Sequence, residues 1–318
     1  MTSAQEVTIR GKRLTLSNLD KVFYPKAGFT KAQVIDFYLR VAPVLLPHLR
    51  DRPLTLKRYP NGVDGQFFYE KNCPSHRPPW VKTAPIWSDQ NQRVMQFCLV
   101  QDVATLAWAA NLADLEMHVP LHRARDVERP DSVVFDLDPG APADLVQCCE
   151  VAVILEQMFA QLGLRSLAKT SGSKGLQIYL PLNQRVTYEE TKPFARAVAD
   201  ALAAKRPDLV VSNMKKSLRA AKVLVDWSQN DPHKTTVCVY SLRARERPTV
   251  STPVTWNEVR ECQRAKDPNL LSFETVAALR RVDELGDLFA PLLSLKQQLP
   301  RVPGGQVFRS NAKHAKIR

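Results

Sequence analysis

The feature that most constrains this chain is a short apolar run that carries two aspartates, residues 133–140, VVFDLDPG. Three apolar residues lead into Asp136 and Asp138, and a Pro-Gly pair then ends the segment. Side chains alternate between the two faces of a β-strand, so we expect both carboxylates on one face, with Leu137 packed behind them. The sequence therefore predicts a strand that presents two acidic side chains, with a simple strand-ending turn as the alternative.

Two carboxylates in this arrangement suit divalent cations. Residues two apart along a strand have Cα atoms roughly 6–7 Å apart. Metal pairs about 3.5–4 Å apart are used for in-line phosphoryl chemistry, and hard cations prefer oxygen ligands. A third carboxylate, Asp226, also ends an apolar run, VLVD at 223–226, and would join the pair if the two strands were neighbours. The alternative for Asp226 is an acidic strand end that faces water.

A small loop, SGSKG at 171–175, lies between two predicted strands and carries one lysine, Lys174. Glycine lets backbone N–H groups turn towards an anion, and the lysine adds a positive charge, so the loop is a candidate phosphate-binding element. It is not a Walker loop, because the spacing differs and no helix follows it. A plain hairpin loop would have a similar sequence.

The chain carries an excess of positive charge, with 45 Lys and Arg against 32 Asp and Glu and a net charge of +13. Such an excess favours a polyanionic partner, since phosphate contacts release counterions. A triphosphate also needs counter-charges beyond its metals. An ordinary solvated face is the alternative for each basic residue. The basic candidates near the acidic segments are Lys57, Arg58, Lys215, Lys216, Arg219, Lys222, Lys234, Arg243 and Arg245.

Three adjacent aromatic residues, Phe67, Phe68 and Tyr69, follow a glycine turn and precede Lys71. Aromatic rings beside positive charge can stack on nucleobases. Three successive side chains cannot all face one side, so we expect at least one of them in the core. His118 is a candidate phosphate or metal-shell contact, with a structural role as the alternative.

The order of predicted elements mixes hairpins with helices, which favours an α+β fold over a doubly wound parallel sheet. Two capping boxes, Thr30 with Gln33 and Thr187 with Glu190, predict helix starts. The predicted helices cover about 30–48, 143–162 and 187–205, and a further helix is expected to begin at Asp102 and to close on 115–118.

The six cysteines show no C-x-x-C pair and no ligand spacing with histidine. We therefore expect reduced thiols, without a zinc site or a disulfide framework. No signal peptide opens the chain and no apolar run reaches membrane-spanning length, so we expect a soluble, intracellular protein without a membrane partner. The main domain is expected over 1–290, followed by a basic, flexible C-terminal tail at 291–318.

Four segments occur in an order typical of a known family: KRYPNGVDG at 57–65, VFDLDPG at 134–140, TSGSKGL at 170–176 and VDWSQN at 225–230. Together they closely resemble the polymerase domain of bacterial ligase D, a member of the archaeo-eukaryotic primase superfamily that works in non-homologous end joining. The resemblance runs from about Ser17 to Ala290. It implies a primase-polymerase core of mixed and antiparallel β-sheets flanked by helices, with an N-terminal subdomain, here as a stand-alone member.

By that resemblance, Asp136, Asp138 and Asp226 are the metal-binding, catalytic carboxylates for two Mn²⁺ or Mg²⁺ ions. The positions assigned to the nucleotide are Lys57, His118, Ser171, Lys174, Gln177, Arg219, Lys234 and Arg243. The positions that match the pocket for the 5′-phosphate of the downstream strand are Asn18, Lys21 and Lys31. Phe68 and Tyr69 match the aromatic pair that packs on the templating base.

One position departs from the family pattern. The second motif usually ends Gly-Leu-His, whereas this chain has Gln177 after Leu176. A neutral amide can donate a hydrogen bond to a phosphate but carries no charge, so we expect a weaker grip on the triphosphate. The Lys-x-Asp-Gly nucleophile motif of a ligase module does not occur in the sequence.

The resemblance implies a template-dependent nucleotidyltransferase that extends or fills DNA ends, with a preference for ribonucleotides. Expected partners are gapped or overhanging DNA ends with a 5′-phosphate, NTP or dNTP, and also Ku and a separate DNA ligase, in the cytoplasm at the nucleoid. One alternative is a non-catalytic DNA-end-binding module. Another is a phosphatase of the haloacid-dehalogenase type, whose first motif is similar but has Thr or Val where this chain has Gly140.

Overall fold

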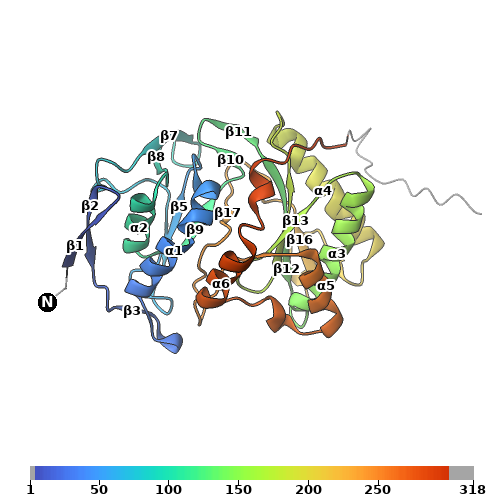
Figure 1. Cartoon of the computed structure of the whole chain (residues 1–318). Coiled ribbons are helices and arrows are strands. Elements are labelled where there is room, and N and C mark those ends of the chain that lie inside the picture. Colours follow the sequence, from blue (N-terminus) through green and yellow to red (C-terminus); the bar gives the residue numbers. More distant parts are fainter. Residues whose placement is uncertain (1–3, 301–318) are drawn as a thin grey trace, which may run out of the picture.

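The computed structural model describes residues 4–300, which form two halves that lie side by side (Figure 1). Each half has a β-sheet towards the middle of the molecule with helices further out, and the last α-helix of the described chain lies between the two halves. The six α-helices of the described residues are α1 (Lys31–Leu49), α2 (Val103–Asn111), α3 (Leu145–Gln161), α4 (Tyr188–Lys205), α5 (Trp256–Ala265) and α6 (Thr275–Leu285).

The half that contains the N-terminus is built on a four-stranded antiparallel sheet of order β17-β9-β5-β6. Its strands are β17 (Thr236–Val237), β9 (Asp114–Val119), β5 (Thr55–Arg58) and β6 (Phe68–Glu70). Helices α1 and α2 share one hydrophobic core with this sheet. The helix α1 begins at the predicted capping box, where the Gln33 side chain accepts from Thr30 N at 2.8 Å and the Thr30 hydroxyl accepts from Gln33 N at 3.4 Å. The predicted helix start is confirmed.

The other half is built on a six-stranded sheet of order β15-β16-β12-β14-β13-β18. Its strands are β15 (Val210–Val211), β16 (Val223–Asp226), β12 (Ser132–Pro139), β14 (Leu176–Pro181), β13 (Leu167–Thr170) and β18 (Pro253–Val254). All neighbours are antiparallel except β15 and β16. This antiparallel order, with helices on the outer flank, confirms the α+β prediction.

Alternation along β12 separates the two cores. Val133, Phe135 and Leu137 face the core that contains α3 and α4, whereas Val134 belongs to the core of the other half. Because residues two apart share a face, the side of β12 that carries Val134 also carries Asp136, and this side is turned towards the four-stranded sheet. The central strand of one half therefore presents its acidic residues to the other half.

Four two-stranded ribbons surround these sheets: β1–β2 (Ala4–Ile9 and Lys12–Ser17), β3–β4 (Val22–Tyr24 and Phe29–Thr30), β7–β8 (Thr83–Ser88 and Arg93–Cys98) and β10–β11 (His122–Arg123 and Asp126–Pro130). The last residue of β8, Cys98, forms a disulfide with Cys73, and the Cα atoms of the two cysteines are 5.0 Å apart. The expectation of six reduced thiols is wrong for this pair. The two residues are 25 positions apart and meet because the segment after β6 pairs with β8 through Cys73 N and Gln96 O, so no local spacing signals the bond.

The described part of the predicted tail, 291–300, lies against the six-stranded sheet. The Gln297 side chain accepts from Arg165 N at 2.6 Å and donates to Arg165 O at 2.9 Å and to Pro181 O at 2.8 Å. The rest of the predicted tail, 301–318, lies outside the described residues. Between residues 4 and 300, no helix combines the length and the apolar character needed to cross a membrane.

Candidate functional site

Three predicted aspartates, Asp136, Asp138 and Asp226, come together on neighbouring strands, and we call them the acidic cluster. Asp136 on β12 lies directly opposite Asp226 on β16 in the antiparallel register, and Asp138 is two residues further along β12. Asp226 is buried, Asp136 is partly buried and Asp138 is exposed. The condition set by the sequence, that the two strands be neighbours, is met.

Two carboxylates of the acidic cluster, Asp136 and Asp138, have raised pKa values. Burial raises the pKa of Asp136 to about 7, and the charges of Asp138 and Asp226 add to this rise. Burial and the charge of Asp226 also raise the pKa of Asp138, against the opposing charges of Arg219 and Arg243. Like charges held this close disfavour each other's ionised form. A bound cation would reverse that effect.

The chemistry of the acidic cluster fits a hard divalent cation, which prefers carboxylate oxygens and would relieve their repulsion. Asp226 is held by neighbours: its Oδ1 accepts from Ser228 N at 2.8 Å and Ser228 Oγ at 2.6 Å, and its Oδ2 accepts from Gln229 Nε2 at 2.9 Å. Such bonds orient a ligand carboxylate while leaving lone pairs free. Over residues 4–300, however, no three His, Cys, Asp or Glu side chains form a ready-made metal site.

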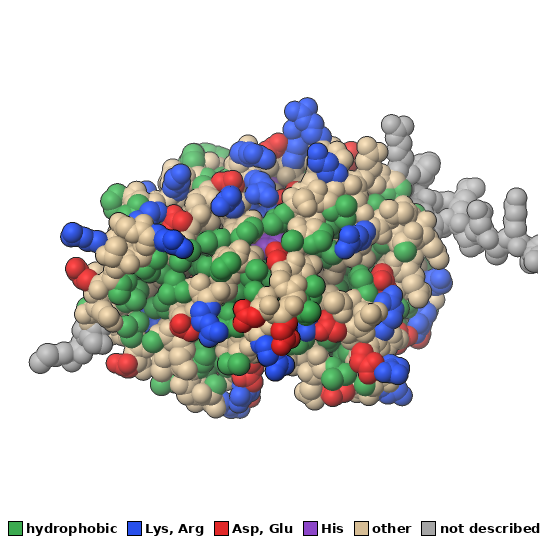
Figure 2. All heavy atoms as spheres, viewed as in Figure 1, with side chains coloured by type: hydrophobic (Ala, Val, Ile, Leu, Met, Phe, Trp, Pro, Cys, Tyr) green, Lys and Arg blue, Asp and Glu red, His purple; other side chains and the backbone are tan. Residues whose placement is uncertain are grey.

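A cleft of about 270 Å³ opens beside the acidic cluster. Its lining comes from both sheets and from the loop at 171–175, and includes His118, Asp136, Asp138, Lys174, Gln177 and Arg243. Figure 2 shows Lys and Arg side chains along the upper rim of the molecule, on both halves. Two residues of the cleft lining, Lys174 and Arg243, place positive charge beside the acidic cluster.

The loop at 171–175 is shaped by its glycines and its first serine. Gly172 has a φ of +65°, a left-handed conformation that glycine adopts readily, and a Cβ at Gly175 would lie 1.9 Å from the carbonyl oxygen of Leu137. The Ser171 hydroxyl accepts from two backbone N–H groups of the loop, at 3.1 and 3.2 Å. Ser171 therefore maintains the shape of the loop, which lies directly against the strand of the acidic cluster.

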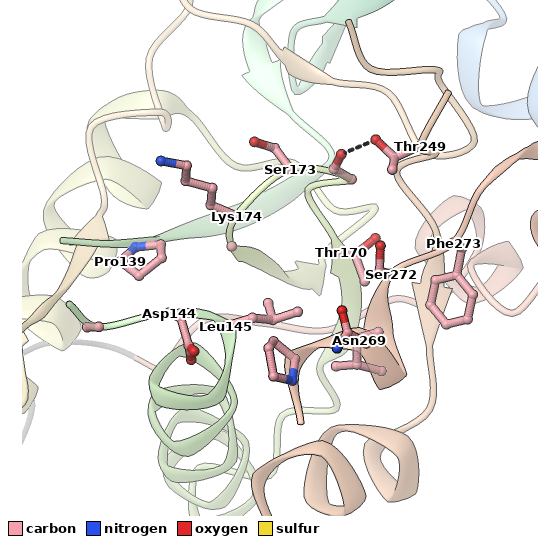
Figure 3. A pocket seen from close by; sticks show the side chains of 15 residues that line it. Pro139, Asp144, Leu145, Thr170, Ser173, Lys174, Thr249, Asn269, Ser272 and Phe273 are labelled. Carbon is pink, nitrogen blue, oxygen red and sulfur yellow. Dashed lines mark hydrogen bonds between the residues drawn. The ribbon is translucent and has the colours of Figure 1, made fainter. Parts of the chain in front are cut away.

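A second hollow, of about 370 Å³, lies on the other side of this loop. Figure 3 shows Lys174 above it, Asp144 at the start of α3 below it, and Asn269 on the neighbouring segment. The Thr249 hydroxyl donates to Gly172 O at 2.6 Å and ties the loop to the chain beyond β17 (Figure 3). Lys174 lines both hollows.

Four of the predicted basic residues lie near the acidic cluster. Lys174 is exposed on the loop, and Arg243 donates from Nη1 to the carbonyl oxygen of the loop's first residue. Arg219 donates to a backbone carbonyl at 2.6 Å, and its charge lowers the pKa of a nearby carboxylate of the cluster against burial. Lys234 Nζ donates to the Ser228 hydroxyl at 2.5 Å. The structure thus brings these four cations to one region.

The side chain of Gln177 is more deeply buried than expected for a residue that only contacts a phosphate. It is 3% exposed and stands on β14 directly opposite Asp136, with Lys169 of β13 on its other side. Tyr179 Oη donates to Gln177 Oε1 at 3.4 Å. Burial raises the pKa of Asp136, and a hydrogen bond from Gln177 opposes that rise. The amide therefore faces a carboxylate of the cluster, and its effect on a triphosphate stays a prediction.

Glu116 on β9 is a site residue that sequence reasoning missed. Its Oε2 lies 3.1 Å from Lys57 Nζ, 3.1 Å from His118 Nε2 and 3.4 Å from Arg243 Nε. Burial raises the pKa of Glu116, but the hydrogen bond from His118 and the charges of Arg243 and Lys57 bring it well below its usual range. Burial lowers the pKa of His118. The Glu-x-His spacing, which puts both side chains on one face of a strand, was the available signal.

The three aromatic residues are all on the surface: Phe67, Phe68 and Tyr69 are 50%, 44% and 55% exposed. The expectation that at least one lies in the core is wrong: Phe68 and Tyr69 stand on β6, the edge strand of its sheet, and Phe67 lies directly before that strand. The Arg58 guanidinium lies 5.1 Å from the Phe68 ring, and Lys57 Nζ lies 5.7 Å from the Tyr69 ring. The aromatic group is thus an exposed surface backed by two cations.

Asn18, Lys21 and Lys31 lie together where the chain enters α1. Lys31 N donates to Lys21 O at 2.9 Å, and Lys21 N donates to Asn18 O at 3.1 Å. Lys31 is 5% exposed and its Nζ donates to Ser17 O at 2.7 Å; burial lowers its pKa to about 8, and the charge of Lys21 adds to the effect. Two cations at a helix N-terminus suit an anion.

Comparison with known proteins identifies the family of this chain. A family model described as the LigD primase-polymerase domain matches residues 30–289, which is most of the chain. The chain belongs to the LigD primase-polymerase family. Membership implies an enzyme of the nucleotidyltransferase type. This membership also argues against the alternative of a haloacid-dehalogenase-type phosphatase.

Relatives of this LigD-family chain include two mycobacterial proteins. The multifunctional non-homologous end joining protein LigD of Mycolicibacterium smegmatis is 42% identical over 285 residues, which cover 89% of this chain and 36% of that protein. The LigD protein of Mycobacterium tuberculosis is also 42% identical, over 88% of this chain and 37% of its own length. The chain thus spans about a third of the length of these relatives.

A solved structure, the polymerase domain of Mycobacterium tuberculosis ligase D in complex with DNA, superposes with a TM-score of 0.82 at 40% identity. The match covers 90% of this chain and 99% of that one. The LigD-family fold implied by the sequence motifs is therefore confirmed over almost the whole chain.

Proposed function

We propose that this chain is a template-dependent polymerase that fills or extends DNA ends in non-homologous end joining. The observation that carries the proposal is the pairing of Asp136 with Asp226 across two strands, beside Asp138 and a cleft that Lys174 and Arg243 line. The likeness to a polymerase domain solved with DNA supports DNA as the substrate. The reaction belongs to the nucleotidyltransferases of class EC 2.7.7.

In the proposed reaction, the primer 3′-hydroxyl oxygen bonds to the α-phosphorus of an NTP or dNTP, the bond to the β-phosphate oxygen breaks, and pyrophosphate leaves as the hydroxyl proton passes to solvent. The acidic cluster would hold two Mn²⁺ or Mg²⁺ ions, which supply Lewis-acid stabilisation when bound. Lys174 and Arg243 offset triphosphate charge, and Ser171 keeps the loop in shape.

The remaining contacts of the proposal lie on the half that contains the N-terminus. Phe68 and Tyr69 offer exposed rings for the templating base. Asn18, Lys21 and Lys31 would receive the 5′-phosphate of the downstream strand at a gap. A preference for ribonucleotides, cooperation with Ku and a separate ligase, and action at the nucleoid complete the proposal. In this proposal the polymerase domain spans residues 1–290, and the basic segment 291–318 follows it.

The test is primer extension on a gapped duplex, with or without a downstream 5′-phosphate, in Mn²⁺ or Mg²⁺ and with NTPs or dNTPs. We expect templated addition that weakens when the 5′-phosphate is removed. Tight binding to the same duplex without any addition would instead favour the end-binding module. A matched control is Asp200→Asn, which changes an exposed carboxylate on α4 and should extend like the unaltered chain.

A further inference from the structure

Glu116 is the common partner of four groups, three side chains and one backbone N–H, that come from β5, from β9 and from the segment after β17. Its side chain is 2% exposed. Its Oε2 receives Lys57 from β5, His118 from β9 itself and Arg243 from the segment after β17. Its Oε1 accepts from Ala244 N at 3.0 Å. Both carboxylate oxygens are therefore engaged, and the side chain is held from three directions.

The two cations that pair with Glu116 also contact two different parts of the site, the exposed aromatic residues and the loop at 171–175. Lys57 Nζ also lies 4.6 Å from the centre of the Phe67 ring and 5.7 Å from that of Tyr69, so it stands under the exposed aromatic group. Arg243 also donates to the carbonyl oxygen of Ser171 and lines the cleft. One carboxylate thus connects the aromatic surface on β6 to the loop at 171–175.

Glu116 also sets which nitrogen of His118 faces a ligand. A carboxylate only accepts hydrogen bonds at neutral pH, so the 3.1 Å contact requires the proton of His118 to be on Nε2. This leaves Nδ1 as the ring nitrogen available to the cleft, which His118 lines. Without the carboxylate the ring would lose the partner that fixes its orientation and tautomer.

The balance of charges makes this arrangement depend on a single carboxylate, that of Glu116. Glu116 carries one negative charge between Lys57 and Arg243, each with one positive charge. Removing one member of a buried charged group leaves the others uncompensated, which costs far more than the net value of the pair. Within residues 4–300 the Arg243 Nε makes no hydrogen bond, and its contact with Glu116 is an ion pair at 3.4 Å.

We propose that Glu116 is a positioning residue that ties Lys57, His118 and Arg243 to one point and thereby keeps the aromatic surface at a fixed distance from the phosphate-binding loop. The inference rests on the proposed polymerase function and adds to it a link between the template side and the nucleotide side. Its consequence is that recognition of the correct base pair and affinity for the triphosphate depend on the same carboxylate.

The experiment compares Glu116→Gln with Glu116→Asp and with Glu258→Gln. Glu258 is a matched control, because it pairs with Arg281 far from the cleft. Steady-state incorporation of the correct and of a mispaired NTP is measured on the gapped duplex, together with DNA affinity and melting temperature. The unaltered chain is the reference for the proposed function itself; if it does not incorporate, that function fails and the inference fails with it.

For Glu116→Gln we expect the KM for the correct NTP to rise roughly 10- to 100-fold, the range for loss of a hydrogen bond to a charged group. Discrimination against the mispaired NTP should fall in the same variant, while DNA affinity stays unchanged. Glu116→Asp keeps the charge and should recover part of both effects. A Glu116→Gln variant that behaves like Glu258→Gln, on a background of active unaltered chain, overturns the inference alone.

A second pair of variants covers the case in which Glu116→Gln does not fold. Lys57→Met removes one cation and its link to the aromatic group while Glu116 stays in place. We expect lowered discrimination in Lys57→Met, and a smaller added effect when Arg243→Met is combined with it than when Arg243→Met is made alone, because both act through one carboxylate. Strictly additive effects would overturn the link.

Discussion

The acidic cluster and Glu116 lie on the two different sheets of this molecule, and the surroundings of their carboxylates are opposite in character. The acidic cluster on the six-stranded sheet has neighbours of its own charge, and burial with mutual repulsion raises the pKa values of Asp136 and Asp138. Glu116 on the four-stranded sheet is buried as well, yet its cationic neighbours bring its pKa well below the usual range. The difference shows that counter-charge, rather than burial, decides the ionic state of these groups.

The comparison also separates two kinds of role. Glu116 is already saturated by donors of the protein, so it is suited to hold other side chains in place. The acidic cluster lacks such compensation at Asp136 and Asp138, so it is suited to receive a cation from outside. The predictions below alter one side of this comparison at a time.

The largest effect is expected from removing one charge of the acidic cluster. Asp138→Asn should lower the rate of nucleotide addition roughly 10³-fold or more, since several kcal/mol of charge stabilisation depend on the carboxylates. Binding to gapped DNA should persist, because the basic surfaces remain. Primer extension and a DNA-binding titration measure the two effects. Addition at the rate of the Asp200→Asn control would contradict the assignment of the cluster.

The loop between the two sides is tested by adding one methyl group. A Cβ at Gly172 would lie 2.7 Å from Val250 C, 2.8 Å from Ser251 N and 2.8 Å from Arg243 Cγ. Gly172→Ala should therefore displace the loop together with Arg243 and raise the KM for NTP by roughly tenfold. Gly163→Ala is a matched control: it has a similar φ of +71° but nothing within 4 Å of the added atom. Equal KM values for the two variants would separate Arg243 from nucleotide binding.

The pH dependence of stability distinguishes the two carboxylate groups directly. Because folding raises the pKa of Asp136 to about 7, its stabilising contribution is complete below the unfolded value of about 3.9 and is lost as the pH rises through 7. In chelator, the free energy of unfolding should therefore fall between about pH 4 and pH 8. Asp136→Asn should flatten this fall by up to roughly 4 kcal/mol, since a rise of about three pKa units corresponds to about 1.4 kcal/mol per unit. Urea titrations at several pH values measure how the free energy of unfolding changes with pH. An unchanged slope in Asp136→Asn would contradict the raised pKa of Asp136.

The smallest effect is expected at the cations furthest from the acidic cluster. Lys31→Met keeps a long side chain at a buried position but removes its charge. The stimulation of primer extension by a downstream 5′-phosphate should fall roughly fivefold, which corresponds to about 1 kcal/mol. Lys26→Met is the control, because Lys26 is exposed and pairs with Glu246. Full stimulation in Lys31→Met would place the phosphate elsewhere.

Much of the fold was predictable because its signals are local. The capping box at Thr30 and the alternation around Asp136 are set by residues within one turn or one strand, and both appear in the structure as expected. The four motifs also indicated the family. Partners distant in sequence were not predictable: Glu116 meets Arg243 across 127 positions of chain, and Cys73 meets Cys98 only through a strand pairing. The exposure of Phe68 and Tyr69 depends on β6 being an edge strand, which no local pattern reports.

The alternation along β12 has a consequence for how this chain can change in length. Val133, Phe135 and Leu137 enter the core beneath α3, while Asp136 lies on the opposite face beside Asp226. Inserting or deleting a single residue upstream within the strand would exchange the two faces, moving carboxylates into apolar packing. Length variation among descendants of this chain should therefore be confined to loops, and any change within 132–138 should be by substitution alone.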